Sequence, residues 1–419
     1  MTAAVLAMGL SHHSAPLAVR EQLALSQREL PGALRSLRSY CNEGVILSTC
    51  NRTEIYAVAP SHKEGRAGVA DFIARYFQVA PGEVDPYVYT HTQGDAARHL
   101  FRVAAGLDSM VLGEAEILGQ VKDALHCAQT AQATGKVTHR LFTQAVHAGK
   151  RARAETGIGA HALSVSHVAV AQAQRLFGDL SPCVILVISA GEMGRLAARI
   201  LAECGCTHLV VANRTYERAA QLAQRLNGRA VALPDLPQAL AQADIVLTAT
   251  DSHDYILTFE AVQSALSARG GRPLFLIDIA VPRDVDPRAA ALPGVHLFNI
   301  DNLGAVDAAN LHARQREVAR VEAIVDAEVE RFLGWYRALD VEPIIAALRA
   351  KVEEVRQEEL ARALRRLAHL APQDQAQIDA LTMSIINKIL HQHFEYLKSE
   401  GDVELVRNLF HLEDEAYKA

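Results

Sequence analysis

The fold of this chain is decided by the stretch Val184-Ile185-Leu186-Val187-Ile188-Ser189-Ala190-Gly191-Glu192-Met193-Gly194. Its first five residues form an unbroken apolar run, which is typical of a strand buried on both faces of a parallel sheet. The turn that follows has the second and third glycines of the G-x-G-x-x-G pattern at Gly191 and Gly194, whereas Ser189 occupies the first position. A strand, this turn and a helix in succession predict a nucleotide-binding βαβ unit.

Strands and helices continue to alternate on the C-terminal side of this turn. Alternation of this kind predicts a parallel sheet with right-handed crossovers. The expected elements are the helix Gly194–Glu203, the strand His208–Ala212, the helix Tyr216–Leu226 and the buried strands Ile245–Thr248 and Leu274–Ile277. We therefore predict a Rossmann-like parallel-sheet domain over residues 161–302.

The end of the second strand indicates which nucleotide is bound. It carries Asn213, Arg214 and Thr215, where an NAD enzyme would place an acid to hold the ribose 2′-hydroxyl. An arginine fork suits phosphate oxygens, so NADPH is the predicted cofactor. The residues predicted to bind it are Ser189, Ala190, Gly191, Glu192, Met193, Gly194, Asn213, Arg214 and Thr215. A sheet that has lost its nucleotide remains the alternative, because Ser189 would cost about 1 kcal/mol if the turn required a positive φ there.

The regions on either side of this domain have different patterns of apolar residues. Residues 1–160 mix short apolar runs with helical spacing, which predicts an α+β domain. Its expected strands are Val5–Gly9, Gly44–Ser48 and Ile55–Ala59, and its expected helices are Gln27–Tyr40 and Gly65–Phe77. Residues 303–419 are almost wholly helical, with a long amphipathic stretch that Pro343 should end or kink. Such a helix pairs either with another chain or with its own monomer.

Composition narrows the class of protein. The chain has 419 residues, 50% of them hydrophobic, and a net charge of −6. This charge does not indicate a nucleic-acid binder, although a local basic patch would still allow one. Its six cysteines follow neither a disulfide framework nor paired zinc-ligand spacing, so no metal site is predicted. With no signal peptide and no apolar run long enough to span a membrane, we expect a reduced, cytoplasmic protein.

Cys50 is the candidate nucleophile. It lies in Leu47-Ser48-Thr49-Cys50-Asn51-Arg52-Thr53-Glu54, which leaves a strand and enters a polar turn. Arg52 could lower the thiol pKa or hold a substrate carboxylate, and the sequence does not choose between these roles. A nucleophilic thiol combined with NADPH predicts acyl reduction: the thiol forms a thioester, and hydride delivery releases an aldehyde.

Two segments resemble the signatures of the glutamyl-tRNA reductase family. They are Thr49–Tyr56 (TCNRTEIY) and His99–Lys122 (HLFRVAAGLDSMVLGEAEILGQVK). The similarity continues through residues 153–159 and 164–170, the nucleotide turn, and residues 212–218, 278–283 and 381–390, so it spans almost the whole chain.

The resemblance implies three domains, an activity and a partner. The domains are a catalytic domain, an NADPH domain similar to that of shikimate dehydrogenase, and a helical dimerisation domain joined by a long spinal helix. The implied reaction reduces glutamyl-tRNA to glutamate-1-semialdehyde in a homodimer, at the first step of tetrapyrrole synthesis. Contact with the aminomutase that uses this product is left open.

The resemblance also assigns roles to residues. Cys50 becomes the nucleophile, and His99 matches a histidine important for activity, with its role open between proton transfer and positioning. The expected substrate-binding residues are Thr49, Asn51, Arg52, Ser109, Glu114, Ala115, Glu116 and Gln120.

Two departures from the family pattern keep two rival interpretations open. Glu116 stands where many members carry glutamine, and Ser189 replaces a glycine. One rival is a small-molecule NADP dehydrogenase of the shikimate type, which would leave the Cys50 turn and the helical tail without a role. The other is a non-catalytic tRNA-binding or assembly protein, for which loss of cofactor binding at Ser189 would be the first sign.

Overall fold

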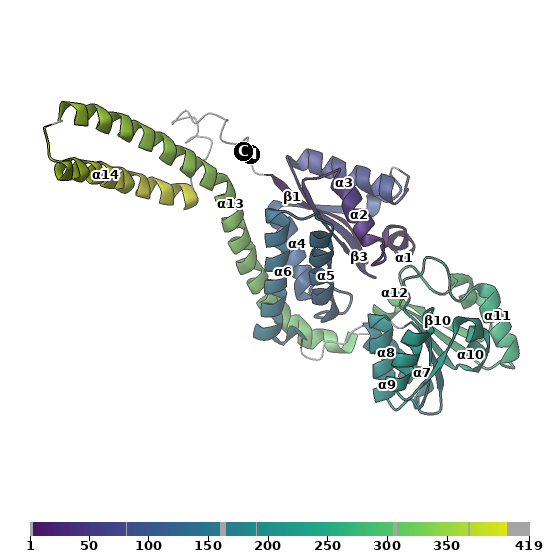
Figure 1. Cartoon of the computed structure of the whole chain (residues 1–419). Helices are drawn as coiled ribbons and strands as arrows, with labels where there is room; N and C mark the ends of the chain where they lie inside the picture. The colour runs from purple at the N-terminus through teal and green to yellow at the C-terminus, as the bar shows by residue number, and fades with distance from the viewer. Residues whose placement is uncertain are drawn as a thin grey trace. The chain divides into compact units, whose positions relative to one another are not determined.

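The computed structural model describes residues 3–80, 82–159, 165–189, 191–304, 308–367 and 369–399. They form two compact units, Ala3–Val329 and a helical unit from Glu330 onward, and Figure 1 follows the chain through both. The first unit holds the two sheets that the sequence predicts. The predicted domain boundaries near residues 160 and 302 fall inside this unit and stay predictions.

The first sheet is antiparallel, with strand order β2-β3-β1-β4. Its strands are β1 (Ala4–Ser11), β2 (Glu43–Ser48), β3 (Arg52–Ala59) and β4 (Tyr89–Thr92). All residues of β1 and β3 are buried, because helices cover both faces of the sheet (Figure 1). The helices of this part of the chain are α1 (Leu17–Arg20), η1 (Glu21–Leu23), α2 (Leu30–Leu37), α3 (His62–Tyr76), η2 (Asp85–Tyr87), α4 (Gln93–Ala105), α5 (Glu116–Thr130), α6 (Lys136–Glu155) and η3 (Gly157–Gly159).

The second sheet is parallel, with strand order β10-β9-β8-β5-β6-β7. The predicted strands are confirmed as β5 (Val184–Ile188), β6 (His208–Ala212), β8 (Ile245–Thr248) and β9 (Leu274–Asp278), and the sheet adds β7 (Arg229–Val231) and β10 (Val295–Asn299) at its edges. Its helices are α7 (Val165–Phe177), α8 (Glu192–Glu203), α9 (Tyr216–Arg225), η4 (Leu233–Asp235), α10 (Leu236–Gln242), α11 (Phe259–Ala268), η5 (Pro287–Ala291) and α12 (Ile300–Gly304). The strand order reverses direction beside β5, and the carboxyl ends of strands at such a point form the usual ligand crevice.

The C-terminal part is built from α13 (Ala308–Arg366) and α14 (Pro372–Ser399). Helix α13 continues through Pro343, so of the two effects expected of this proline, an end of the helix or a kink, the first does not occur. The part of α13 before Glu330 is fixed by carboxylates to the half of the first unit that carries the antiparallel sheet, and one of them, Glu328, accepts hydrogen bonds from Gln144 and Arg151. Beyond Glu330, α13 and α14 pack through Val341, Leu348 and Leu390. The described helices include none that is both long enough and apolar enough to cross a membrane.

Candidate active site

Cys50 lies in a three-residue turn between β2 and β3. The turn is closed by the amide of Thr49, which donates to the carbonyl of Arg52 at 2.8 Å. The hydroxyl of Thr49 accepts from the amide of Asn51 at 3.2 Å. The segment after β1 fixes the turn from outside, since the amide of His12 donates to the carbonyl of Asn51 at 2.8 Å. Cys50 is therefore held on a rigid turn by backbone and hydroxyl groups.

The surroundings of Cys50 keep its thiol protonated. Burial, together with the nearby carboxylates of Glu114 and Glu116, raises the pKa of Cys50 to about 12, although Arg20 acts in the opposite direction. A thiol with a raised pKa is a weak nucleophile until it loses its proton. The cation that favours the thiolate is Arg20, whose Nη1 donates to the carbonyl oxygen of Cys50 at 2.8 Å.

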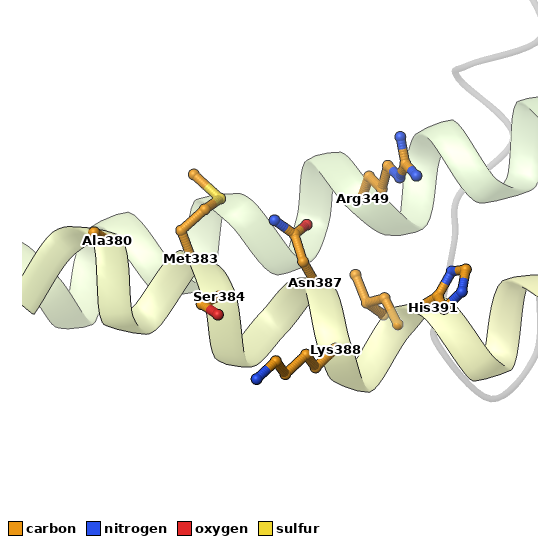
Figure 2. Close-up of a pocket in the computed structure, with 8 residues that line it drawn as sticks. Arg349, Ala380, Met383, Ser384, Asn387, Lys388 and His391 are labelled. Carbon is orange, nitrogen blue, oxygen red and sulfur yellow. The ribbon is translucent and has the colours of Figure 1, made fainter.

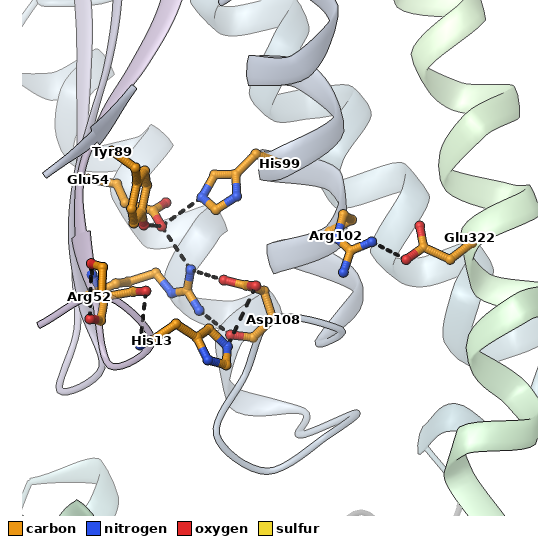
Figure 3. A network of polar contacts seen from close by, with 10 residues as sticks. His13, Arg52, Glu54, Tyr89, His99, Arg102, Asp108 and Glu322 are labelled. Atoms are coloured by element: carbon orange, nitrogen blue, oxygen red, sulfur yellow. Dashed lines mark hydrogen bonds and ion pairs between the residues drawn. The ribbon is translucent and has the colours of Figure 1, made fainter. Parts of the chain in front are cut away.

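Arg52 is the centre of a buried ion-pair network (Figure 3). Its Nη1 lies 2.8 Å from Oε1 of Glu54 and 2.8 Å from Oδ2 of Asp108, and its Nη2 donates to the carbonyl of Asp108. Burial alone would lower the pKa of Arg52, but Glu54 and Asp108 together raise it. From the sequence, the guanidinium of Arg52 is expected either to lower the pKa of the Cys50 thiol or to hold a substrate carboxylate. In the structure it is instead held by two carboxylates of the protein.

Glu54 accepts four hydrogen bonds although its side chain has no exposed surface. The donors are Nη1 of Arg52 at 2.8 Å, the hydroxyls of Tyr56 and Tyr89 at 2.5 Å each, and Nε2 of His99 at 2.9 Å. Burial alone would raise the pKa of Glu54, but His99 and Arg52 bring it well below its usual range. The carboxylate therefore stays ionised and orients the groups around it.

His99 projects from α4 toward Glu54, as Figure 3 shows. Its ring stacks on that of His91, with ring centroids 4.6 Å apart. On the other side of the network, Nε2 of His13 lies 3.7 Å from Oδ1 of Asp108. The predicted residues Arg52 and His99 are therefore brought together, and they meet through Glu54.

The remaining predicted substrate residues lie on one loop and on the helix after it. Glu114 is buried, and the hydroxyl of Ser109 beside it partly offsets the rise that burial causes in its pKa. Ala115 caps α5, Glu116 begins it, and Gln120 lies one turn later. The loop passes so close to Ile158 that a Cβ at Gly113 would meet its carbonyl oxygen at 2.1 Å, and Gly113 has φ +81°. Only glycine fits this position.

The nucleotide turn follows β5 at the carboxyl edge of the parallel sheet. Ser189 is buried and is absent from the positive-φ residues of the described chain, so the strain considered for it does not arise. Its hydroxyl accepts from the amide of Gly191 at 3.0 Å. A Cβ at Gly194 would lie 2.8 Å from the Cβ of Ser189. The serine and Gly194 fit together, and Met193 packs on the core of this half.

The other predicted cofactor residues follow β6, the neighbouring strand of the sheet. Oδ1 of Asn213 accepts from the amide of Thr215 at 2.8 Å, which shapes the turn before α9. Arg214 is exposed, and it forms no ion pair within the part of the chain that the structure describes. Ala190 and the side chain of Glu192 lie outside the described residues. In the same described part, no group of three His, Cys, Asp or Glu side chains could hold a metal ion.

Four residues of this site were missed by sequence reasoning: Arg20, Glu54, Tyr89 and Asp108. Glu54 could have been found, because residues two apart on a strand share a face and Arg52 with Glu54 then forms a buried pair. Tyr89 and Asp108 are brought in by other elements, so no local pattern marks them. Arg20 is 30 residues from Cys50 in sequence and reaches it only through the fold.

Family models match three successive parts of the chain. The N-terminal domain model of glutamyl-tRNA reductase matches residues 8–156. The shikimate/quinate 5-dehydrogenase model matches residues 171–306, and the dimerisation domain model of glutamyl-tRNA reductase matches residues 320–412.

Individual relatives match over nearly the full length. A glutamyl-tRNA reductase of Syntrophotalea carbinolica is 42% identical, covering 97% of this chain and 94% of the relative. One from Geobacillus kaustophilus is 44% identical, with coverages of 98% and 92%. The solved structure of the glutamyl-tRNA reductase from Methanopyrus kandleri has a TM-score of 0.51 and 32% identity, covering 97% of this chain and 99% of that one.

Proposed function

The chain belongs to the glutamyl-tRNA reductase family, and from this premise we propose how its residues carry out the reaction. The substrate is glutamyl-tRNA, the product is glutamate-1-semialdehyde, and tRNA is released. This is the first step of tetrapyrrole synthesis from glutamate. The rival dehydrogenase of the shikimate type would account for residues 171–306 only.

Cys50 is the nucleophile of the proposed reaction. The observation that carries this assignment is its place on the rigid turn between β2 and β3, where Nη1 of Arg20 donates to the carbonyl oxygen of Cys50. The deprotonated thiol attacks the carbonyl carbon of the glutamyl ester. The carbon–sulfur bond forms as the ester carbon–oxygen bond breaks, and the tRNA hydroxyl leaves with a proton. The resulting thioester is more easily reduced than the ester.

The nucleotide turn fits a dinucleotide. The amide-rich start of α8 faces the carboxyl edge of the sheet, and Gly191 is exposed there. Arg214 is an exposed guanidinium at the end of β6, where a 2′-phosphate is held in such folds. We therefore propose NADPH as the cofactor that, when bound, supplies the hydride for thioester reduction. Hydride addition to the thioester carbonyl carbon would break the carbon–sulfur bond, release the aldehyde and return Cys50 as the thiolate.

The Glu54 network positions the substrate pocket rather than taking part in bond making. Because its carboxylate is ionised and fully hydrogen-bonded, Glu54 fixes His99 and Arg52. The pocket itself is then lined by Thr49, Asn51, Ser109, Glu114, Glu116 and Gln120. Asn51 is buried with its Oδ1 unpaired within the described residues, as expected for a group that awaits a polar substrate.

Trapping the acyl-enzyme tests this assignment. Glutamyl-tRNA is mixed with the full chain without nicotinamide cofactor, quenched in acid, digested and analysed by mass spectrometry. We expect a glutamyl adduct on the peptide that contains Cys50, no adduct in Cys50→Ser, and slow glutamate release from the wild type. A wild type that binds glutamyl-tRNA and never acquires the adduct would contradict the thioester and favour a non-catalytic tRNA-binding protein.

We also propose a homodimer formed through the helical unit. Leu381 and Ile385 of α14 lie one helical turn apart and are exposed to 60% and 49%. The same helical unit has a pocket of about 960 Å³, lined by Arg349 of α13 and by Met383, Asn387, Lys388 and His391 of α14 among others (Figure 2). Large apolar side chains on one helix face mark an interaction surface, and the match to a dimerisation domain indicates a second copy.

We also propose that the protein is located in the cytoplasm. All six cysteines are free, and reduced thiols are the rule in the cytoplasm. Contact with the aminomutase that uses the product stays a prediction of the family resemblance alone.

A further inference from the structure

The first unit has two halves: the catalytic half carries the antiparallel sheet, and the nucleotide-binding half carries the parallel sheet. Two consecutive residues, Arg20 and Glu21, join these halves. They lie where α1 meets η1. Arg20 is 2% exposed. Its Nη1 donates to the carbonyl of Cys50 at 2.8 Å, and its Nη2 donates to the carboxylate of Asp301, at the start of α12. One buried guanidinium therefore contacts both the turn of the nucleophile and the nucleotide-binding half.

Glu21 holds a second segment of the nucleotide-binding half. Its carboxylate accepts three hydrogen bonds from Arg283: from the amide at 2.8 Å, from Nε at 2.7 Å and from Nη2 at 2.7 Å. Both side chains are largely covered, with 21% and 15% exposed. A bidentate pair with an added amide bond has fixed geometry as well as charge attraction. It is thus stronger than an ordinary surface pair.

The loop that carries Arg283 is itself rigid. It follows β9, and Asp278 accepts from the amides of Ala280 at 3.1 Å and Val285 at 3.0 Å. Asp284 accepts from the amide of Thr250 at 2.8 Å. Because hydrogen bonds hold the loop on both sides of Arg283, the contact between Glu21 and Arg283 fixes Glu21 to the parallel sheet.

Cys50 lies at the interface between the two halves that the contacts of Arg20 and Glu21 join. Leu17 and Val111 of the catalytic half are buried in the same apolar cluster as Ile279 and Ile300 of the nucleotide-binding half, and Cys50 packs against this cluster. Docking of the two halves therefore partly covers Cys50 and restricts the access of water to its thiol. Water exclusion matters for a thioester, since hydrolysis competes with reduction.

We propose that Arg20 and Glu21 form a clasp, with Arg20 as a positioning residue for Cys50, that holds the nucleotide-binding half closed over the thioester. This inference rests on the proposed function and deepens it: the clasp directs the acyl group toward semialdehyde rather than toward free glutamate. Opening the clasp leaves Cys50 able to accept the glutamyl group but exposes the thioester to water.

Charge reversal tests the clasp through the reactivity of Cys50. The variants are Glu21→Arg, Arg283→Glu, the double exchange, Asp301→Asn, and Arg225→Glu as a control on the exposed end of α9. Iodoacetamide alkylation of Cys50 is followed by mass spectrometry at fixed pH. We expect at least a fivefold faster alkylation in both single reversals and a twofold or greater rise in Asp301→Asn. The double exchange should return close to the wild-type rate, and the control should not change.

The two single reversals separate opening from electrostatics. A cation at residue 21 would favour the thiolate and an anion at residue 283 would disfavour it, so a purely electrostatic effect moves the two rates in opposite directions. Unchanged rates, opposite changes, or no rescue by the double exchange would each overturn the clasp. Product analysis with glutamyl-tRNA and NADPH adds the second readout, a higher ratio of glutamate to semialdehyde in the single reversals. A wild type that makes no semialdehyde would contradict the proposed function, whereas the alkylation rates would still decide the clasp.

Discussion

At the scale of residues, the catalytic half depends on one ionised carboxylate, Glu54. It compensates the buried guanidinium of Arg52 and accepts from Tyr56, Tyr89 and His99. Removing one partner of a buried pair leaves a desolvated charge, which costs about 3 to 5 kcal/mol. Because the network joins β3, β4 and α4, its loss should be felt throughout this half.

Glu54→Gln should therefore lower the opening free energy of the β3 amides by about 3 kcal/mol in native-state hydrogen exchange. Tyr89→Phe is the matched control, because it removes one of the four donors and should cost about 1 kcal/mol. Equal and small effects of the two substitutions would show that the charge of Glu54 does not stabilise this half.

The thiol of Cys50 sets the pH dependence of its own reactivity. Its pKa is raised to about 12, so the thiolate fraction should grow about tenfold for each pH unit between pH 7 and 10. Glu114→Gln removes a carboxylate that raises this pKa and should speed alkylation at pH 8 about threefold or more. Glu64→Gln, on the exposed start of α3, should have no effect. An alkylation rate that levels off near pH 8 to 9 in the wild type would contradict the raised pKa.

The sequence predicts some features of the site around Cys50 and not others. The pattern around Cys50 predicted a polar turn after a strand, and that turn lies between β2 and β3. The pattern did not show that Arg52 is taken by Glu54 and Asp108, or that Arg20 is the cation that favours the thiolate. Contacts between residues far apart in sequence follow from the fold and leave no local signal. The sequence leaves open that Ser189 strains the nucleotide turn. In the structure, its hydroxyl instead accepts a hydrogen bond from the amide of Gly191 within that turn.

At the scale of elements, the inner strands of the parallel sheet were predictable and its edges were not. Strands β5 and β8 are buried apart from Val184, so their sequences are apolar except for Thr248 at the end of β8. Strands β7 and β10 lie at the edges, and β7 has three residues of which one is buried. A short edge strand needs no apolar run, and its sequence then resembles a loop. The length of α13 was expected, but its passage through Pro343 was not distinguished from an end there.

The turn after β6 should set the choice of cofactor. Arg214→Gln should raise the KM for NADPH about tenfold or more and leave that for NADH nearly unchanged, because a hydrogen bond to a charged group is worth about 1.5 to 3 kcal/mol. Arg225→Gln, at the exposed end of α9, is the control for loss of a nearby positive charge. Equal effects of Arg214→Gln on both cofactors would contradict a 2′-phosphate site at this turn.

At the scale of the whole molecule, the helical unit should hold two copies together. Leu381→Glu with Ile385→Glu places two charges on the exposed apolar face of α14, which should shift the protein from dimer to monomer in sedimentation experiments. Glu359→Gln on the exposed face of α13 is the control. A double variant that sediments as the wild type does would move the dimer interface to another surface.

The Cys50 turn and the nucleotide turn act in one proposed reaction, and one assay tests both. Purified wild type and Cys50→Ser are given labelled glutamyl-tRNA with NADPH, and glutamate-1-semialdehyde is quantified in a single turnover. We expect semialdehyde from the wild type, none from Cys50→Ser, and none from the wild type without a nicotinamide cofactor. Semialdehyde from Cys50→Ser at a rate near that of the wild type would contradict the proposed reaction, because reduction would then proceed without the thioester.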